Sequence, residues 1–276
     1  MADTADVTRH YASDSIAERV LAALRAASGP DVAITPETLA PLDQFHGRGL
    51  AATKELAKLL APQAGEHLLD IGCGLGGPAR WIAARFGCRF TGIDLTPQFC
   101  EAAIALTAAT GQLDSVRIMN GSATELPYPD ATFDRAYSQN VVMNIADKAR
   151  FYSEAFRVVK PGGVVAFSNI GMGPNGAPHY PVPWASTAAT SFLATSEETR
   201  GQIEAAGFKI LSLNDPTAAV LPDLMAFRAK IERDGLPKLG THAFMGERML
   251  ELQANSTRNL AEGRTALIEV LVQKPA

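Results

Sequence analysis

Four glycines in the segment LLDIGCGLGGPARW, residues 68–81, have the spacing of a nucleotide-binding loop. Gly72, Gly74 and Gly77 satisfy G-x-G-x-x-G, the pattern of dinucleotide-binding loops, where glycine permits a tight turn and a close approach of ligand to backbone. With Asp70 in front, the same loop satisfies D-x-G-x-G, which suits S-adenosylmethionine. The glycine spacing alone leaves both ligands open.

Asp70 distinguishes the two ligands by its charge. A carboxylate two residues before the first glycine would lie close to the pyrophosphate of a dinucleotide, and repulsion between the two anions in a poorly solvated cleft costs kilocalories. S-adenosylmethionine has no phosphate, and it carries an ammonium and a sulfonium group that a carboxylate stabilises. The sequence therefore favours S-adenosylmethionine, with S-adenosylhomocysteine as its product, over NAD(P).

A second acidic residue follows the next predicted strand. The segment FTGIDL ends in Asp94, at the distance of about twenty residues from the glycine loop where an acidic side chain accepts both ribose hydroxyls. Leu95 comes directly after it and can cover one face of the adenine. Both candidate ligands share this feature, so it supports a nucleoside site without choosing between them.

The elements that position these residues alternate along the chain. Strands are predicted at 67–71, 90–93, 116–119, 134–138, 163–168, 208–213 and 266–272, and helices between them at 78–85, 97–109, 148–159 and 196–206. This alternation is typical of a mostly parallel sheet with helices on both faces.

Helical segments are also predicted outside the alternating core. A helix starts at the capping box of Ser15 and Glu18, a loop (TPETLAPLDQFHGRG) follows, and a second helix covers about 50–60. Residues 214–264 form an insert with helices near 221–233 and 244–261, the longer of which carries Met245, Met249 and Leu252 on one face. This face either walls a substrate site or packs on the domain, and both alternatives stay open.

Composition excludes several classes of protein. The formal net charge is −4 with no block of like charges, which indicates neither a nucleic-acid groove nor an anionic membrane surface. Residues 1–14 contain no apolar leader, and no apolar run reaches the ~20 residues of a membrane span. The three cysteines have neither disulfide nor zinc spacing. We therefore expect a soluble cytoplasmic protein with reduced thiols and no metal.

Four motifs together resemble the class I S-adenosylmethionine-dependent methyltransferases. They are LLDIGCGLGGPARW, GIDLTPQF, GSATELPYPDATFD and VVKPGGVVAFSNI, in the order and spacing of that family over residues 66–212. The segment is most similar to small-molecule N-methyltransferases (sarcosine, dimethylglycine and phosphoethanolamine types) and to tocopherol and quinone C-methyltransferases. A looser resemblance extends to DQFHGRG and to the late HAFMGERMLELQANSTRNLAEGR.

The resemblance implies a fold and a domain organisation. The fold is α/β: a Rossmann-like, doubly wound seven-stranded sheet with a reversed last strand. A single methyltransferase domain then spans residues 1–276, with an N-terminal helical cap (1–62), the Rossmann-like core (63–213 and 265–276) and a helical lid insert (214–264).

The resemblance also implies cofactor contacts. Besides the loop and the ribose carboxylate, it assigns to the cofactor Gln98, Ser122 and Ala123 at the adenine edge, Asn140 near the methionine moiety, and Gln44 closing over the cofactor carboxylate. Ser122 departs from the Asp usual in the family. Because a hydroxyl lacks the charge of a carboxylate, either the cofactor binds modestly more weakly or the backbone N–H of Ala123 recognises the adenine.

The acceptor determines which further residues are needed. An uncharged amine needs no base at the moment of attack, a hydroxyl needs one, and a carbon nucleophile needs an electron-rich π system. Candidate catalytic residues are His46, Tyr180 and His242, and candidate substrate contacts are His46, Asn144, His179, Trp184, Phe244 and Met245. Asn144 stands where several relatives have histidine, and no Arg/Lys cluster is present to hold a phosphate, which argues against phosphoethanolamine.

These observations predict a methyltransferase acting on a small molecule at an amine nitrogen, with a homodimer left open as its assembly. Two alternatives remain. A C-methyltransferase acting on a prenyl, quinone or polyketide-like carbon would suit the apolar insert. Proteins of another class, an NAD(P) oxidoreductase or a non-catalytic S-adenosylmethionine-binding module, would keep the glycines and Asp94.

Overall fold

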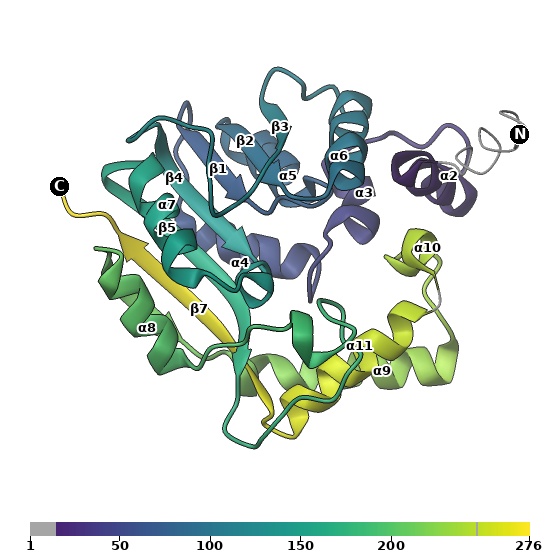
Figure 1. Ribbon diagram of the computed structural model, residues 1–276. Coiled ribbons are helices and arrows are strands. Elements are labelled where there is room, and N and C mark those ends of the chain that lie inside the picture. The colour runs from purple at the N-terminus through teal and green to yellow at the C-terminus, as the bar shows by residue number, and fades with distance from the viewer. Residues whose placement is uncertain (1–14, 247) are drawn as a thin grey trace, which may run out of the picture.

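A seven-stranded sheet forms the centre of the protein (Figure 1). The computed structural model describes residues 15–246 and 248–276. The strands lie in the order β3-β2-β1-β4-β5-β7-β6, and β7 is antiparallel to both of its neighbours while the other pairs are parallel. The strands are β1 (His67–Ile71), β2 (Arg89–Asp94), β3 (Val116–Asn120), β4 (Phe133–Gln139), β5 (Val159–Met172), β6 (Lys209–Asn214) and β7 (Thr265–Gln273). The doubly wound sheet with a reversed last strand is thus confirmed.

Helices cover both faces of the sheet. The apolar sides of α4 and α5 pack on one face, and those of α7 and α8 on the other. The helices are α2 (Ile16–Ser28), α3 (Pro36–Asp43), α4 (Leu50–Leu60), α5 (Gly77–Phe86), α6 (Pro97–Ala109), α7 (Lys148–Val158), α8 (Ser196–Ala205), α9 (Thr217–Asp234), α10 (His242–Met245) and α11 (Arg248–Ala261), with short 3₁₀ turns η1 (Val142–Asn144) and η2 (Ala188–Thr190). No helix within residues 15–246 and 248–276 is long and apolar enough to cross a bilayer.

Two local predictions were wrong. The segment predicted as a loop before α4 contains the helix α3, which Thr35 caps and Pro36 begins, because proline fits the first turn of a helix. The long helix predicted at 244–261 is two helices, since Gly246 adopts a left-handed backbone (φ 80°) that ends α10. Met245 and Met249 therefore lie on different helices, the first exposed and the second buried. The prediction about a leader in residues 1–14 lies outside the described residues.

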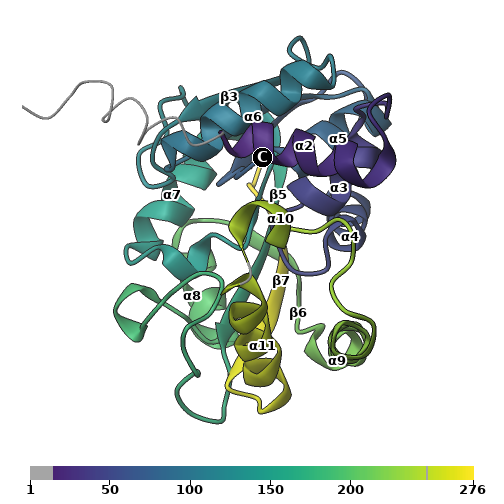
Figure 2. The same cartoon turned by 90° about the vertical axis from the view of Figure 1, so that its right-hand side faces the viewer.

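The N-terminal helices and the insert meet over the sheet. Figure 2 shows α10 beside α2, and Figure 1 shows both on the side of the sheet toward which the arrows of β1 and β4 point. One apolar cluster joins them, which we call the cap–insert cluster: Ala17, Val20, Leu24, Leu39, Leu42, Leu75, Ala102, Leu106 and Phe244. Because Leu75 belongs to the glycine loop, the same cluster ties cap and insert to the predicted cofactor site.

Candidate functional site

The four glycines of the loop between β1 and α5 have different surroundings. A Cβ on Gly72 would clash with the Val141 side chain at 2.3 Å, and one on Gly77 would clash with the Asp43 carbonyl oxygen at 2.5 Å. At Gly74 (φ 51°) a Cβ would meet only Phe45, at 4.0 Å. Gly72 and Gly77 are thus required by protein packing, and Gly74 is the glycine that leaves its backbone open to a ligand.

A buried ion pair occupies the start of α5. Arg80 donates to the Asp43 carboxylate at 2.8 Å, and their side chains are 0% and 1% exposed. Burial raises the pKa of Asp43 and the Arg80 guanidinium lowers it. A dinucleotide places its pyrophosphate at such a helix start, but here the carbonyl and carboxylate of Asp43 lie against its first residue. The structure therefore disfavours NAD(P) more directly than the sequence does.

Asp94 is positioned by the loops around it. Its carboxylate accepts the backbone N–H groups of Gly74 and Thr96, each at 2.9 Å. Leu95 is 73% exposed beside it, and Gln98 is exposed in the first turn of α6. A carboxylate beside an open backbone and an exposed apolar side chain fits the ribose and adenine of S-adenosylmethionine.

Asp70 lies beneath the glycine loop. Its side chain is 2% exposed and accepts the Tyr137 hydroxyl at 2.6 Å. Burial raises its pKa to about 7; the Tyr137 hydrogen bond lowers that pKa, and the negative charge of Asp94 raises it. A cation bound at the loop would favour the ionised form, which suits the ammonium of S-adenosylmethionine.

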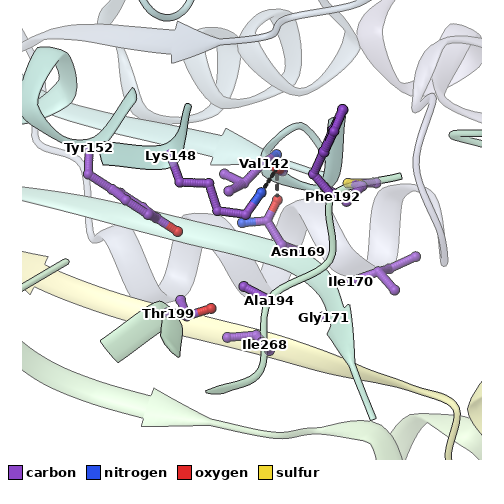
Figure 3. Close-up of a pocket in the computed structure, with 11 residues that line it drawn as sticks. Val142, Lys148, Tyr152, Asn169, Ile170, Gly171, Phe192, Ala194, Thr199 and Ile268 are labelled. Carbon is purple, nitrogen blue, oxygen red and sulfur yellow. Dashed lines mark hydrogen bonds between the residues drawn. The ribbon is translucent and has the colours of Figure 1, made fainter. Parts of the chain in front are cut away.

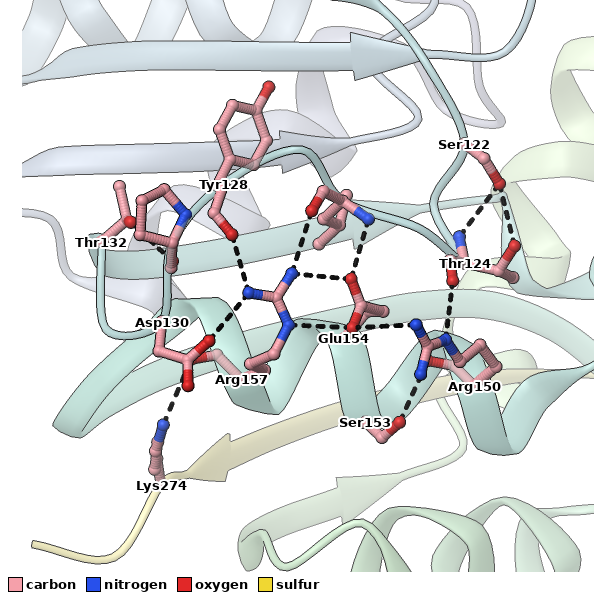
Figure 4. Close-up of polar contacts among 12 residues, drawn as sticks. Ser122, Thr124, Tyr128, Asp130, Thr132, Arg150, Ser153, Glu154, Arg157 and Lys274 are labelled. Atoms are coloured by element: carbon pink, nitrogen blue, oxygen red, sulfur yellow. Dashed lines mark hydrogen bonds and ion pairs between the residues drawn. The ribbon is translucent and has the colours of Figure 1, made fainter.

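The loop that carries Ser122 and Ala123 is fastened to α7 (Figure 4). Arg157 donates to the carbonyls of Leu126 (2.9 Å) and Tyr128 (2.7 Å), and Glu154 accepts the N–H of Leu126 at 2.8 Å. The Arg157 hydrogen bond lowers the pKa of Glu154, which stays ionised. These two residues position the loop.

Ser122 itself bonds within that loop. Its hydroxyl lies 2.8 Å from the hydroxyl of Thr124 and accepts the Thr124 N–H. Ala123 packs on the core. The adenine contact of both residues stays a prediction.

The turn after β4 is clamped from two sides (Figure 3). The side-chain oxygen of Asn169 accepts the N–H groups of Val141 (3.2 Å) and Val142 (3.1 Å), while the buried ammonium of Lys148 donates to the Val142 carbonyl at 2.9 Å. Asn140 begins this turn with a left-handed backbone (φ 57°). Since Val141 also packs on Gly72, the clamp fixes Asn140 relative to the glycine loop.

Gln44, His46 and Thr53 form a chain at the start of α4. The buried Thr53 hydroxyl donates to the side-chain oxygen of Gln44. Nε2 of His46 lies 3.1 Å from the Thr53 hydroxyl oxygen and Nδ1 lies 3.1 Å from the Gly47 carbonyl oxygen, and a neutral ring donates to one of these two oxygens. Burial lowers the pKa of His46 to about 4, so the ring is neutral. The side-chain nitrogen of Gln44 is buried without a partner, and is thus a donor left for a ligand.

The predicted acceptor contacts in the loop after β5, and Asn144 before that strand, bind other parts of the protein. His179 lies 2.8 Å from the carboxylate of Glu262, the residue directly after α11, and the indole of Trp184 donates to Ser191. Asn144 donates to the Trp184 carbonyl at 2.7 Å. The half-buried Tyr180 lies in the same loop. These contacts shape the loop, and an additional role in binding substrate stays a prediction.

The predicted site residues of the insert differ in their surroundings: one packs against the N-terminal cap and another is exposed to solvent. Phe244 is 4% exposed and packs 5.9 Å from the ring of Phe45, whereas Met245 is 38% exposed. His242 is half-buried at the start of α10. No group of three or more His, Cys, Asp or Glu side chains in the described ranges is arranged to hold a metal ion.

Sequence reasoning missed the pairs that connect segments far apart in the chain. Asp43 and Arg80 are separated by 37 positions, and Glu154 contacts the adenine loop across 28. No sequence motif indicated Lys148 or Asn169 either, because each forms hydrogen bonds with backbone atoms and not with a ligand.

Comparison with known proteins gives one family. Residues 69–167 match the family described as methyltransferase domain. Phosphoethanolamine N-methyltransferase of Triticum aestivum is 32% identical over 67% of this chain, which spans only 36% of the wheat protein. O-methyltransferase resE of Aspergillus sclerotiorum is 29% identical over 76% of this chain and 77% of its own.

A solved structure has the same fold. Phosphoethanolamine N-methyltransferase 2 of Haemonchus contortus, in complex with phosphomonomethylethanolamine and S-adenosylhomocysteine, superposes with a TM-score of 0.70 at 20% identity, over 96% of this chain and 61% of that one. Strand order, glycine loop and family match agree: the chain belongs to the class I S-adenosylmethionine-dependent methyltransferases.

Proposed function

We propose that the protein transfers the methyl group of S-adenosylmethionine to the nitrogen of a small amine. The observation that carries the cofactor assignment is the Asp94 carboxylate, fixed by two backbone N–H groups beside the open Gly74, while Asp43 excludes a pyrophosphate from α5. The cofactor supplies an electrophilic methyl group on sulfur. The chain holds the partners in line and keeps water out with the cap–insert cluster.

An amine acceptor is favoured because it needs no base at the moment of attack. His46 is a weak base because burial lowers its pKa to about 4, and Nε2 of His179 is bound to the Glu262 carboxylate. Neither ring is therefore suited to take a proton from a hydroxyl. Asn144 is committed to the Trp184 carbonyl, which supports the prediction that phosphoethanolamine, the substrate in the names of several relatives, is not the acceptor here.

A carbon acceptor is the second candidate. The exposed Met245 and the 38% exposed Phe192 would suit a prenyl or quinone substrate, whose own π electrons attack the methyl group. An acceptor hydroxyl, as the name of the resE relative suggests for that protein, would require a base, and the half-buried His242 and Tyr180 are the remaining predicted candidates.

Isothermal titration calorimetry with S-adenosylhomocysteine tests the cofactor. We expect binding that Asp94→Ala removes and no binding of NAD; binding of NAD would overturn the assignment. A radiolabelled methyl-transfer screen should then find incorporation with amines and not with matched alcohols or prenyl compounds. Label in an alcohol or a prenyl acceptor alone would refute the amine, and cofactor binding without transfer to any class would favour a non-catalytic module.

We further propose a cytoplasmic protein whose partners are small molecules and not nucleic acid, with a homodimer as its assembly. The formal net charge of −4 supports the exclusion of nucleic acid, because a phosphate backbone attracts basic surfaces. Size-exclusion chromatography with light scattering measures the assembly, and a monomeric mass would refute the dimer.

A further inference from the structure

A polar row crosses the sheet on the face covered by α4. Gln139, Ser168 and Glu269 are register partners on β4, β5 and β7, so their side chains leave the same face of the sheet. Two residues nearer the amino ends of β4 and β5, that face carries Tyr137 and Ala166, which are fully buried in an apolar cluster with α4. Packing against a helix accounts for the apolar residues but not for the polar row.

The row lies under the first turn of α4. Arg135 of β4 donates to the carbonyl of Leu60, the last residue of α4, so the helix runs from the carboxyl edge of the sheet toward its amino edge. Leu56 covers the apolar row, and the fully buried Thr53 lies almost one turn earlier, over the polar row. Gln44, 3% exposed and bonded to Thr53, carries a buried amide nitrogen without a partner at this level.

The row itself has unused hydrogen-bonding capacity. The side-chain oxygen of Gln139 is buried without a partner, and the half-buried Glu269 carboxylate has no hydrogen bond or ion pair to any residue in the described part of the chain. Its neighbouring cation Arg48 forms a two-point ion pair with Glu55 instead. Burial raises the pKa of Glu269, the negative charge of Glu55 raises it further and Arg48 lowers it, so this carboxylate lacks a counter-ion of its own.

The row starts at the cofactor loop. Asp70 pairs with Tyr137 across β1 and β4, so two residues later Gln139 leaves the sheet level with Gly72. Asn140, the residue assigned to the methionine end of the cofactor, is next in the chain. A group bound at the row is therefore adjacent to the place where the methyl group is delivered.

We propose that Gln139, Ser168 and Glu269 form a subsite that binds an ammonium group of the methyl acceptor. An ammonium has three donors and a positive charge, and the row offers an amide oxygen, a hydroxyl and a carboxylate as acceptors. A neutral alcohol would leave Glu269 without a counter-charge in a half-buried place. This inference rests on the proposed methyltransferase function and adds the charge of the bound acceptor to it. An ammonium nitrogen has no lone pair, so the acceptor gives one proton to the Glu269 carboxylate before transfer, and the neutral amine then attacks the methyl group.

A pair of simple probes tests the subsite. On the protein saturated with S-adenosylhomocysteine, we expect 2-phenylethylammonium to bind about tenfold more tightly than 2-phenylethanol, measured by ligand-observed NMR titration. Glu269→Gln should abolish this preference with the cofactor-product Kd unchanged. Glu204→Gln, which removes the same charge from α8 on the opposite face, should keep it.

Equal affinity of the two probes for the wild-type complex, no binding of either, or a preference that survives Glu269→Gln would each overturn the subsite. A Glu269→Gln protein that also loses S-adenosylhomocysteine binding would instead assign Glu269 to the cofactor, and again refute the proposal. If Glu269→Gln does not fold, Glu269→Asp is the second variant, because it keeps the charge but places it one methylene further from the bound ammonium. It should weaken binding of 2-phenylethylammonium and leave binding of 2-phenylethanol unchanged. Failure of the wild type to bind S-adenosylhomocysteine is a different result, because it refutes the proposed function itself.

Discussion

The buried pair of Asp43 and Arg80 should be the most costly polar contact to break. The two side chains are 1% and 0% exposed and 2.8 Å apart, so Asp43→Asn removes the counter-charge and leaves a guanidinium inside the protein. Arg80 keeps hydrogen bonds to the carbonyls of Leu75 (2.6 Å) and Ala103 (3.2 Å) and to Thr107, which softens the loss.

The expected cost follows from measured cases. Removing one partner of a buried ion pair destabilises a protein by about 3–5 kcal/mol, and the retained bonds of Arg80 place this pair near about 3 kcal/mol. Total stability of a domain is about 5–15 kcal/mol, so Asp43→Asn should visibly lower the urea midpoint, followed by the fluorescence of the two tryptophans. The matched control is Glu55→Gln, which removes the 52% exposed carboxylate that pairs with the 18% exposed Arg48 and should cost less than about 1 kcal/mol.

The same variants show whether burial is the cause. Replacing both partners by apolar residues of similar size, Asp43→Leu with Arg80→Met, should recover most of the stability that Asp43→Asn loses, because no unpaired charge remains. If Asp43→Asn and Glu55→Gln cost the same, the argument from burial is wrong. If the apolar pair is less stable than Asp43→Asn, the pair contributes through its hydrogen bonds and not through its charge.

Three further predictions concern the cofactor loop. Asp94→Ala should weaken S-adenosylhomocysteine binding by at least about tenfold in calorimetry, because its hydrogen bonds are charge-assisted; an unchanged Kd would remove Asp94 from the site. The folded pKa of Asp70 is raised to about 7 from an unfolded 3.8, so its stabilising contribution is complete below pH 3.8 and disappears as pH rises through 7; Asp70→Asn should flatten this part of the pH–stability curve, and parallel curves would contradict the shift. Gly77→Ala should cost about 1–3 kcal/mol because the new Cβ meets the carbonyl that ends α3, whereas Gly47→Ala, with nothing within 4 Å, should be nearly neutral in the same denaturation assay.

Elements encoded by a few neighbouring residues could be predicted from the sequence. The capping boxes of Ser15 with Glu18 and of Thr195 with Glu198 are present, and β1 and α6 have the predicted bounds. Each signal involves residues close together in the sequence, so it does not depend on tertiary contacts. The short α3, with Pro41 inside it, has no such periodicity; burial of Leu39 and Leu42 and the contact of Asp43 with Arg80 hold it in place.

Site residues were predictable where a strand fixes the direction of a side chain. Asp70 and Asp94 end or nearly end parallel strands, so their place at the carboxyl edge follows from the sheet alone. His179 was beyond this reasoning, because its loop is directed by Glu262, 83 positions later. Glu269 was equally out of reach, since its neighbours are set by the register of β5 with β7.

The glycine pattern identifies a fold and not a ligand, and the structure shows why. Only Gly74 leaves its backbone open, while Gly72 and Gly77 make room for Val141 and for the end of α3. Two of the glycines would therefore be required here even if the ligand had no phosphate at all. What separates this loop from a dinucleotide site is the group placed on the helix start: an anion from the protein itself leaves no place for the anion of a ligand. An aspartate that lies against the start of α5 in space, as Asp43 at the end of α3 does, is thus a more selective signal than the glycines. Because Asp43 is far from α5 in the sequence, this signal can be recognised only in the folded structure.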